Sequence, residues 1–295
     1  MTLPPSGTPS GTPSGTPSGT PSRSPSRGQA IKKLTPAPVW KLGSDTYWWW
    51  RNRGRHLLAH TFDPRWAEST RRLKHYENIH ANQRCFIIGN GPSLRHTDLS
   101  KLRGEYTFGL NRIYLLFPEL GFSTTYLVSV NDLVLEQTAA EMQTLAVPKF
   151  LTWRSRRWFH TDPKVTYLDT DFTGEEDFCS DITGRIFEGF TVTYVALQLA
   201  YHMGFTEAIL VGVDHNFVTQ GAANQAVVSQ GDDPNHFSPS YFGKGFKWQL
   251  PDLPGSERAF IMARDAYSSA GRRILDATIG GKLTVFPKEE YSSLF

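Results

Sequence analysis

From residue 84 onward the chain alternates short apolar runs with longer segments of helical periodicity. Such runs are typical of parallel strands that are covered on both faces. We predict strands at Arg84–Gly89, Tyr106–Leu110, Thr125–Val130, Lys149–Thr152, Val165–Leu168, Ala208–Val213 and Lys282–Phe286. We predict helices at Leu133–Leu145, Thr191–Met203 and Glu257–Ala277. This alternation predicts an α/β fold with a doubly wound, mostly parallel, Rossmann-like sheet, whose ligands bind at the carboxyl ends of the strands.

A glycine-rich loop follows the first predicted strand and reads Gly89-Asn90-Gly91-Pro92-Ser93-Leu94. Glycine lets the backbone approach a phosphate closely and adopt positive φ, and the helix start that follows supplies free amides. Leu94 stands where a dinucleotide fingerprint has its third glycine, and no Gly-Lys-Ser/Thr follows, so neither a dehydrogenase nor a P-loop is indicated. A plain structural turn is the alternative reading.

Three asparagines lie at or near the ends of successive predicted strands, namely Asn90, Asn111 and Asn131. An amide side chain both donates and accepts hydrogen bonds, so it can bind a base edge or a ribose hydroxyl. A single asparagine in such a place is usually a turn former. Three at equivalent places on neighbouring strands favour a ligand site.

A second polar cluster follows the strand that is predicted to end at Val213. Asp214 closes that strand and is followed by His215 and Asn216, and the loop after them contains Asp232, Asp233 and His236. Asp214 is a candidate to hold Mg²⁺ or to fix a helix terminus. His236 is a candidate general base, since imidazoles titrate near neutral pH. The basic run Trp153–Arg157 is either a contact for an anionic ligand or a solvated loop.

The N-terminal part of the chain has a different texture. Residues 7–22 repeat Gly-Thr-Pro-Ser and offer no apolar surface, so we predict a disordered tail over residues 1–38. Residues 39–82 are aromatic and basic, with a helix predicted over residues 64–80. They form either an extension that packs on the core or a peripheral membrane patch. Residues 83–295 form the predicted nucleotide-binding domain.

Composition limits the classes of protein and partner. The net charge of the 295 residues is only +3, which gives no basis for a nucleic-acid partner. Two cysteines are too few for a disulfide scaffold or a cysteine-built zinc site. The N-terminus lacks the apolar core of a signal peptide, and no run approaches the roughly 18 apolar residues of a membrane span. We therefore expect a cytoplasmic protein, with contact at the inner face of the membrane as the alternative.

The run Cys85–Leu94, followed by Phe108–Leu115, resembles the family named after the archaeal 6-hydroxymethylpterin diphosphokinase. The same pattern is similar to bacterial sialyltransferases that use CMP-sialic acid. Thr191–Tyr194 and Gly212–Asp214 fit both groups. The resemblance covers roughly residues 80–290.

The resemblance to the sialyltransferases implies roles for particular residues and chemistry without an obligatory metal. It implies that nucleotide contacts come from Asn90, Ser93, Asn111 and Asn131, and phosphate contacts from Thr191 to Thr193. The chain departs from those enzymes at Asn216, where they carry a tyrosine that steadies the leaving phosphate. His236 matches an earlier histidine of their motif rather than the base. Tyr241 is a candidate replacement as phosphate donor.

Three hypotheses follow. The first is a glycosyltransferase-like enzyme of surface glycan synthesis, in which a nucleotide-activated sugar donates to a small-molecule or glycan acceptor. In that enzyme Gly89, Gly91 and the asparagines hold the donor, His236 deprotonates the acceptor, and Tyr241 assists the leaving phosphate. The second is a diphosphokinase that requires Mg²⁺, with Asp214 and Asp232 as metal ligands. The third is a nucleotide-binding protein without catalytic activity.

Overall fold

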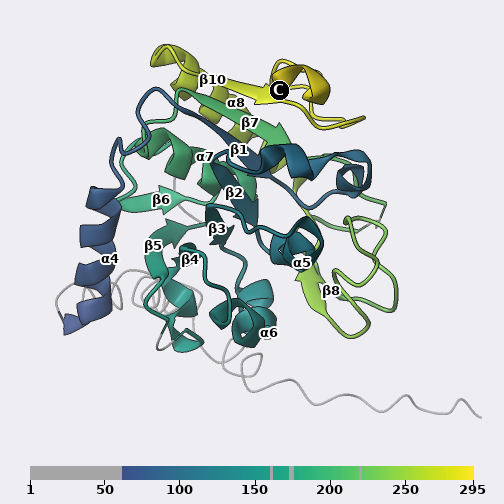
Figure 1. The fold of residues 1–295 in the computed structure, drawn as a ribbon. Helices are drawn as coiled ribbons and strands as arrows, with labels where there is room; N and C mark the ends of the chain where they lie inside the picture. The colour runs from purple at the N-terminus through teal and green to yellow at the C-terminus, as the bar shows by residue number, and fades with distance from the viewer. Residues whose placement is uncertain (1–61, 160–161, 173–175, 219–220) are drawn as a thin grey trace, which may run out of the picture. The chain divides into compact units, whose positions relative to one another are not determined.

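The predicted parallel sheet is present. In the computed structural model, which describes residues 62–159, 162–172, 176–218 and 221–295, eight strands pair in the order β10-β7-β1-β2-β3-β4-β5-β6 (Figure 1). All pairings in this sheet are parallel. The strands are β1 (Arg84–Ile88), β2 (Thr107–Leu110), β3 (Tyr126–Ser129), β4 (Lys149–Thr152), β5 (Val165–Asp171), β6 (Arg185–Phe187), β7 (Glu207–Val211) and β10 (Arg273–Asp276). A separate antiparallel ribbon joins β8 (Ala226–Val228) to β9 (Lys247–Gln249).

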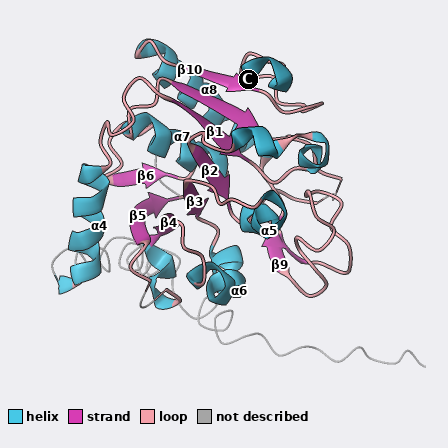
Figure 2. Cartoon of the chain, in the orientation of Figure 1, coloured by secondary structure: helices cyan, strands magenta, loops and turns pink. Residues whose placement is uncertain are grey.

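Helices surround the sheet, as Figure 2 shows by colour. They are α4 (Pro64–His75), α5 (Phe117–Leu120), α6 (Asp132–Gln143), α7 (Val192–His202) and α8 (Leu253–Ser269). The central helix α7 packs across β1, β2 and β3 and against α8. Its apolar side chains from Tyr194 to Leu199 are fully buried, because sheet and neighbouring helix cover it on both sides. The fold is therefore the predicted α/β class.

The burial of β1 explains its sequence. Cys85, Phe86, Ile87 and Ile88 are each at most 1% exposed, as expected for a central parallel strand. Such a strand has no solvent face, so polar and apolar residues do not alternate along it. Within the part of the chain that the structure describes, no helix is both long and apolar enough to cross a membrane.

Two predictions near the C-terminus are wrong. The helix predicted to reach Ala277 ends at Ser269, because Gly271 adopts a positive φ of 69° and turns the chain into β10. The strand predicted at Lys282–Phe286 is absent, and β10 is the last strand of the sheet. Leu283 and Phe286 are apolar because they are buried in the core, not because they pair in a sheet.

The N-terminal predictions fall largely outside the described residues. The tail over residues 1–38 and the tryptophans before residue 62 belong to this part of the chain. Within the described part, α4 ends at His75, five residues before the predicted end of the helix, and continues as turns. Trp66 on α4 is buried and meets the ring of Trp153 edge-to-face, with the ring centroids 5.0 Å apart.

Candidate functional site

A pocket of about 170 Å³ lies at the carboxyl ends of β7, β1 and β2. The chain moves from β1 to β2 on one side and returns through α7 to β7 on the other, so the strand order reverses between β1 and β7. Open α/β sheets bind their ligands at such a switch point. Seven predicted site residues line the pocket: Gly89, Asn90, Asn111, Thr191, Thr193, Asp214 and His236.

A larger, more open hollow of about 400 Å³ lies beside α4 and the amino ends of β4 and β5. Its cations already bind main-chain carbonyl groups. Lys164 Nζ donates to the carbonyl of Ala146 at 2.6 Å, and Arg72 Nη1 donates to that of Val165 at 3.3 Å. Because the cations of this hollow are engaged, and because the predicted site residues line the other pocket, the switch-point pocket is the better candidate site.

The glycines of the first loop serve contacts within the protein. The N–H of Gly91 donates to the carbonyl of Gly212 at 2.9 Å, which joins the loops after β1 and β7. A Cβ atom on Gly91 would overlap the carboxylate of Asp214. The expectation of a positive φ at Gly91 is wrong, because its φ is −68°. Glycine is required there by the close approach of Asp214.

Asp214 binds Ser93 through both carboxylate oxygens. The N–H of Ser93 donates to Oδ1 at 3.1 Å, and its hydroxyl donates to Oδ2 at 2.6 Å. Burial raises the pKa of the Asp214 carboxyl above its ordinary value, and the bonds from Ser93 oppose that shift. Asp214 therefore lines the pocket and also ties two loops together.

The residues predicted to hold Mg²⁺ do not fit a dedicated metal site. Both carboxylate oxygens of Asp214 are engaged by Ser93, and Asp232 is exposed and does not line the pocket. No group of three or more His, Cys, Asp or Glu side chains in the described ranges is arranged to hold a metal ion.

Two of the three asparagines line the pocket. Asn90 Oδ1 is buried and has no hydrogen-bond partner among the described residues. Asn111 has a φ of 47°, and its Oδ1 accepts a bond of 2.9 Å from the Ser129 hydroxyl. Strained backbone of this kind concentrates at functional sites. Asn131 instead caps α6, where its Oδ1 accepts from the N–H of Leu133 at 3.0 Å.

The amino end of α7 faces the same pocket. Thr191 caps the helix through its hydroxyl, which accepts from the N–H of Thr193 at 3.3 Å. Residues 191–193 all line the pocket. The amino end of a helix carries unsatisfied N–H groups and a partial positive charge, so it binds anions.

His236 is held in place by a buried carboxylate. Its Nδ1 lies 2.7 Å from Asp233 Oδ2, and the two side chains are 12% and 3% exposed. The imidazole also stacks on the ring of Tyr241 with centroids 4.0 Å apart. With the Nδ1 proton donated to Asp233, the remaining nitrogen, Nε2, is the one that can accept a proton.

Tyr241 lies behind His236 and does not line the pocket. Its side chain is fully buried, its hydroxyl accepts from the N–H of Arg112 at 3.3 Å, and burial raises its pKa. The sequence placed Tyr241 at the donor phosphate, whereas its contacts are those of a support for the imidazole.

Sequence reasoning missed several features of the site. The pairing of Asp233 with His236 was not predicted, since nothing in the sequence distinguishes Asp233 from exposed Asp232. The pocket also has an apolar wall to which Phe190, Phe217 and Phe260 contribute. Phe190 has a φ of 63° directly before the cap of α7, and no sequence signal marks such a conformation in phenylalanine.

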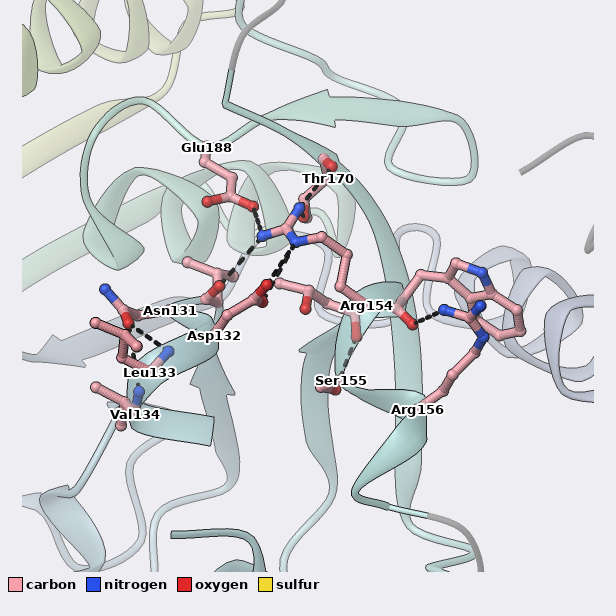
Figure 3. A network of polar contacts seen from close by, with 12 residues as sticks. Asn131, Asp132, Leu133, Val134, Arg154, Ser155, Arg156, Thr170 and Glu188 are labelled. Atoms are coloured by element: carbon pink, nitrogen blue, oxygen red, sulfur yellow. Dashed lines mark hydrogen bonds and ion pairs between the residues drawn. The ribbon is translucent and has the colours of Figure 1, made fainter. Parts of the chain in front are cut away.

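The basic run after β4 does not contribute to the pocket. Figure 3 shows Arg154 enclosed by partners from neighbouring strand ends. Its guanidinium binds Glu188 at 2.7 Å, Asp132 at 3.2 Å and the carbonyl of Thr170 at 3.0 Å. Arg154 is thus a crosslink between the end of β5 and the segments after β3, β4 and β6.

The fold and the pocket together define a Rossmann-like α/β protein with a candidate ligand pocket at the switch point of its sheet. The chain belongs to the MptE-like family, described as 6-hydroxymethylpterin diphosphokinase MptE-like, whose model matches residues 61–220. This membership supports a nucleotide-dependent transferase as the general class.

Among solved structures, the chain is similar to one described as the MAf glycosyltransferase from Magnetospirillum magneticum AMB-1. The two are 16% identical with a TM-score of 0.46, and the match covers 86% of this chain and 42% of the other. The chain thus spans less than half the length of that protein. No curated protein matches the chain.

Proposed function

We propose that this protein transfers a glycosyl group from a nucleotide-activated donor to an acceptor hydroxyl, in the manner of the sialyltransferases of surface glycan synthesis. The observation that carries the proposal is the pair of Asp233 and His236 at the pocket. An imidazole with one nitrogen held by a buried carboxylate presents the other as a base. The amino end of α7 provides an anion site in the same pocket.

The proposed roles follow the geometry. Asn90 and Asn111 bind the nucleoside part of the donor, and residues 191–193 bind its phosphate through the N–H groups of α7. Nε2 of His236 takes the proton of the acceptor hydroxyl as that oxygen bonds to the anomeric carbon. The bond from that carbon to the phosphate oxygen breaks, and the nucleotide leaves with the electron pair. Tyr241 keeps the imidazole plane fixed by stacking.

A thermal-shift screen tests the donor class. Ligands that bind only the folded state raise the free energy of unfolding by mass action, by about 2.7 kcal/mol at a hundredfold excess over Kd. The melting temperature rises as a result. We expect at least one of CMP, CDP, UDP, GDP and ATP to stabilise the full chain. If none of them raises the melting temperature with or without Mg²⁺, the proposal is wrong.

The family name supports a second candidate, the transfer of a diphosphate from ATP to 6-hydroxymethylpterin. That reaction requires Mg²⁺ bound through the ATP phosphates and protein carboxylates. The described residues favour the first candidate, since no group of three or more His, Cys, Asp or Glu side chains among them is arranged to hold a metal ion. Activity that survives EDTA supports glycosyl transfer, whereas ATP-specific activity that EDTA abolishes supports the diphosphokinase.

The variant His236→Ala tests the base directly. General-base catalysis contributes typically about 10²–10⁴-fold, so turnover should fall by that order while donor affinity is kept. The acidic limb of the pH–rate profile should disappear with the imidazole. Turnover near wild type with an intact acidic limb would show that His236 is not the base.

A further inference from the structure

The described residues that line the pocket include no ordinary phosphate-binding cation. Among the described residues that line it there is neither Lys nor Arg, and the titratable side chains are those of Asp214, His215 and His236. A phosphate group bound beside the anionic Asp214 needs a compensating positive charge. Among the described residues that line the pocket, only a protonated histidine can provide a full positive charge.

The imidazole of His215 is hydrogen-bonded through only one of its two nitrogens among the described residues. Its Nε2 lies 3.0 Å from Glu257 Oε1 on α8, and its side chain is 8% exposed. Its ring also contacts Phe260 edge-on, with centroids 6.3 Å apart. No described residue hydrogen-bonds Nδ1, and the residue itself lines the pocket. One nitrogen is therefore fixed by the protein and the other is available to a ligand.

The backbone of His215 supports a role beyond packing. Its φ is 53°, in the left-handed region that residues other than glycine seldom adopt. Such conformations cluster at ligand sites. The strained turn places the side chain against α8 instead of letting the chain continue from β7 in an extended conformation.

We propose that His215, protonated and paired with Glu257, is the residue that binds the phosphate-bearing part of the ligand. The phosphate lies between Nδ1 of His215 and the amino ends of α7 and α8, since Thr193, Leu253 and Ser256 line the same pocket. The inference rests on the proposed function and assigns its phosphate contact, for which Tyr241 is too deeply buried.

The two histidines of the pocket take different roles in the proposal, phosphate binding for His215 and proton removal for His236, because their surroundings differ. His236 stacks on Tyr241, and its main-chain carbonyl accepts from Arg95, in the 3₁₀ helix after β1. His215 contacts α8, which packs against α7. The phosphate at the amino end of α7 therefore lies on the side of His215, and the acceptor on the side of His236.

This assignment makes phosphate binding depend on a proton. The charged groups around the His215 imidazole are Glu257 on α8, Asp214 next to it in the chain, and His236 in the same pocket. Neutral His215 presents a lone pair at Nδ1 and repels phosphate, whereas the imidazolium donates a charged hydrogen bond. Affinity for a phosphate ligand should thus fall as rising pH removes the proton from the imidazolium.

The test is calorimetric titration of the full chain with inorganic pyrophosphate between about pH 6 and about pH 8.5, a range that spans the titration of imidazoles. We expect Kd to rise about tenfold per pH unit above the imidazole titration, as one-proton linkage requires. Pyrophosphate itself gains negative charge over this range, so the variants below are needed to assign the pH dependence to a residue.

Three variants assign the proton to a residue. His215→Gln can still donate to Glu257 but cannot bind a proton, so we expect weak binding that no longer depends on pH. His236→Gln should keep the wild-type dependence. Glu257→Gln should move the midpoint to lower pH, because the imidazolium loses its anionic partner. A purely structural tether between His215 and α8 would not move that midpoint.

The outcomes separate this inference from the proposed function. An undetectable or pH-independent affinity of the wild type for pyrophosphate would overturn the role of His215, as would a His215→Gln variant with the wild-type dependence. The nucleotide screen and His236→Ala test the reaction independently of these titrations. A chain that responds to nucleotides but ignores pyrophosphate therefore retains its proposed function and loses this inference.

Discussion

At the scale of single residues, Asp233 determines which nitrogen of His236 can act as a base. Its carboxylate accepts from Nδ1 at 2.7 Å, and its other oxygen accepts from the N–H of Asn235 at 2.9 Å. The second bond holds the loop, so the carboxylate is itself fixed. Asp233 is therefore a positioning residue in the proposed reaction, and it acts on the substrate through His236.

The variant Asp233→Asn tests this role. We expect turnover to fall, with a loss no larger than the about 10²–10⁴-fold of the base itself, and KM for the donor to stay within about twofold. The acidic limb of the pH–rate profile should move to lower pH, because the imidazolium loses an anionic partner. Asp232→Asn is the matched control, since its side chain is exposed. Equal effects of the two variants would contradict the assignment.

Gly91 shows how a correct residue can be chosen for an incomplete reason. The sequence marks it as a loop glycine near a ligand, whereas the neighbour that excludes a side chain is Asp214. That carboxylate lies 123 positions further along the chain, so no local pattern reveals the contact. The long-range hydrogen bonds of Asp214 were unpredictable for the same reason.

Gly91→Ala should destabilise the fold by about 1–3 kcal/mol, the usual cost of forcing extra volume into a filled space. Chemical denaturation measures this directly. Gly184→Ala is the control, because a Cβ there meets nothing within 4 Å and the residue is exposed. If both variants unfold at the wild-type denaturant concentration, the loop has room that the contact with Asp214 does not allow.

At the scale of elements, the sequence predicted the strands that are buried on both faces and failed at the margins. The runs of β1 to β5 and β7 are apolar because helices and loops cover the sheet, so composition marks them. The short strands β6, β8 and β9 were not predicted, since only three residues pair in each. The last strand was predicted at the wrong place because Leu283 is apolar as a buried core residue and not as part of a strand. Gly271 is a helix-stop signal in the sequence that would have placed the end of the preceding helix correctly.

The crosslink of Arg154 and Glu188 gives a prediction about pH. Burial raises the pKa of Glu188, because desolvation outweighs the attraction of Arg154. The folded state then binds this proton more readily than the unfolded chain, so its contribution to stability falls as pH rises above the ordinary value of 4.5.

Replacing the carboxyl removes that dependence. We expect Glu188→Gln to gain stability relative to the wild type between about pH 5 and about pH 7, by up to about 1.4 kcal/mol per unit of raised pKa. Urea denaturation at both pH values measures the change. Glu176→Gln is the control, because Arg258 lowers the pKa of Glu176 and its titration lies below this range. If the difference in stability between Glu188→Gln and the wild type is the same at both pH values, the raised pKa of Glu188 is contradicted.

At the scale of the whole described unit, three segments far apart in sequence meet at one sheet edge. They are the loop after β1, the start of α7 and the segment after β7. Strand-end reasoning predicted that the segments after β1 and β7 meet, because the carboxyl ends of parallel strands share an edge. The resemblance alone implied that residues 191–193 join them. Asn131 satisfied the same rule and yet caps a helix, since β3 lies farther from the switch point. The topology of the sheet therefore predicts the edge at which the pocket lies, and the order of the strands decides which residues line the pocket.

The final prediction compares the N-terminal repeat with the first described helix. Deleting residues 1–28 should leave the melting temperature within about 2 °C of the full chain, because the repeat has no apolar surface to contribute. Trp66→Ala should lower it strongly, since Trp66 is 7% exposed and packs on Trp153. Loss of a buried tryptophan costs about 3–5 kcal/mol, and about 2–4 °C per kcal/mol gives a fall of about 6–20 °C. Differential scanning calorimetry measures both. A truncated chain that melts as early as Trp66→Ala would show that the repeat stabilises the fold, and an unshifted Trp66→Ala would show that α4 does not.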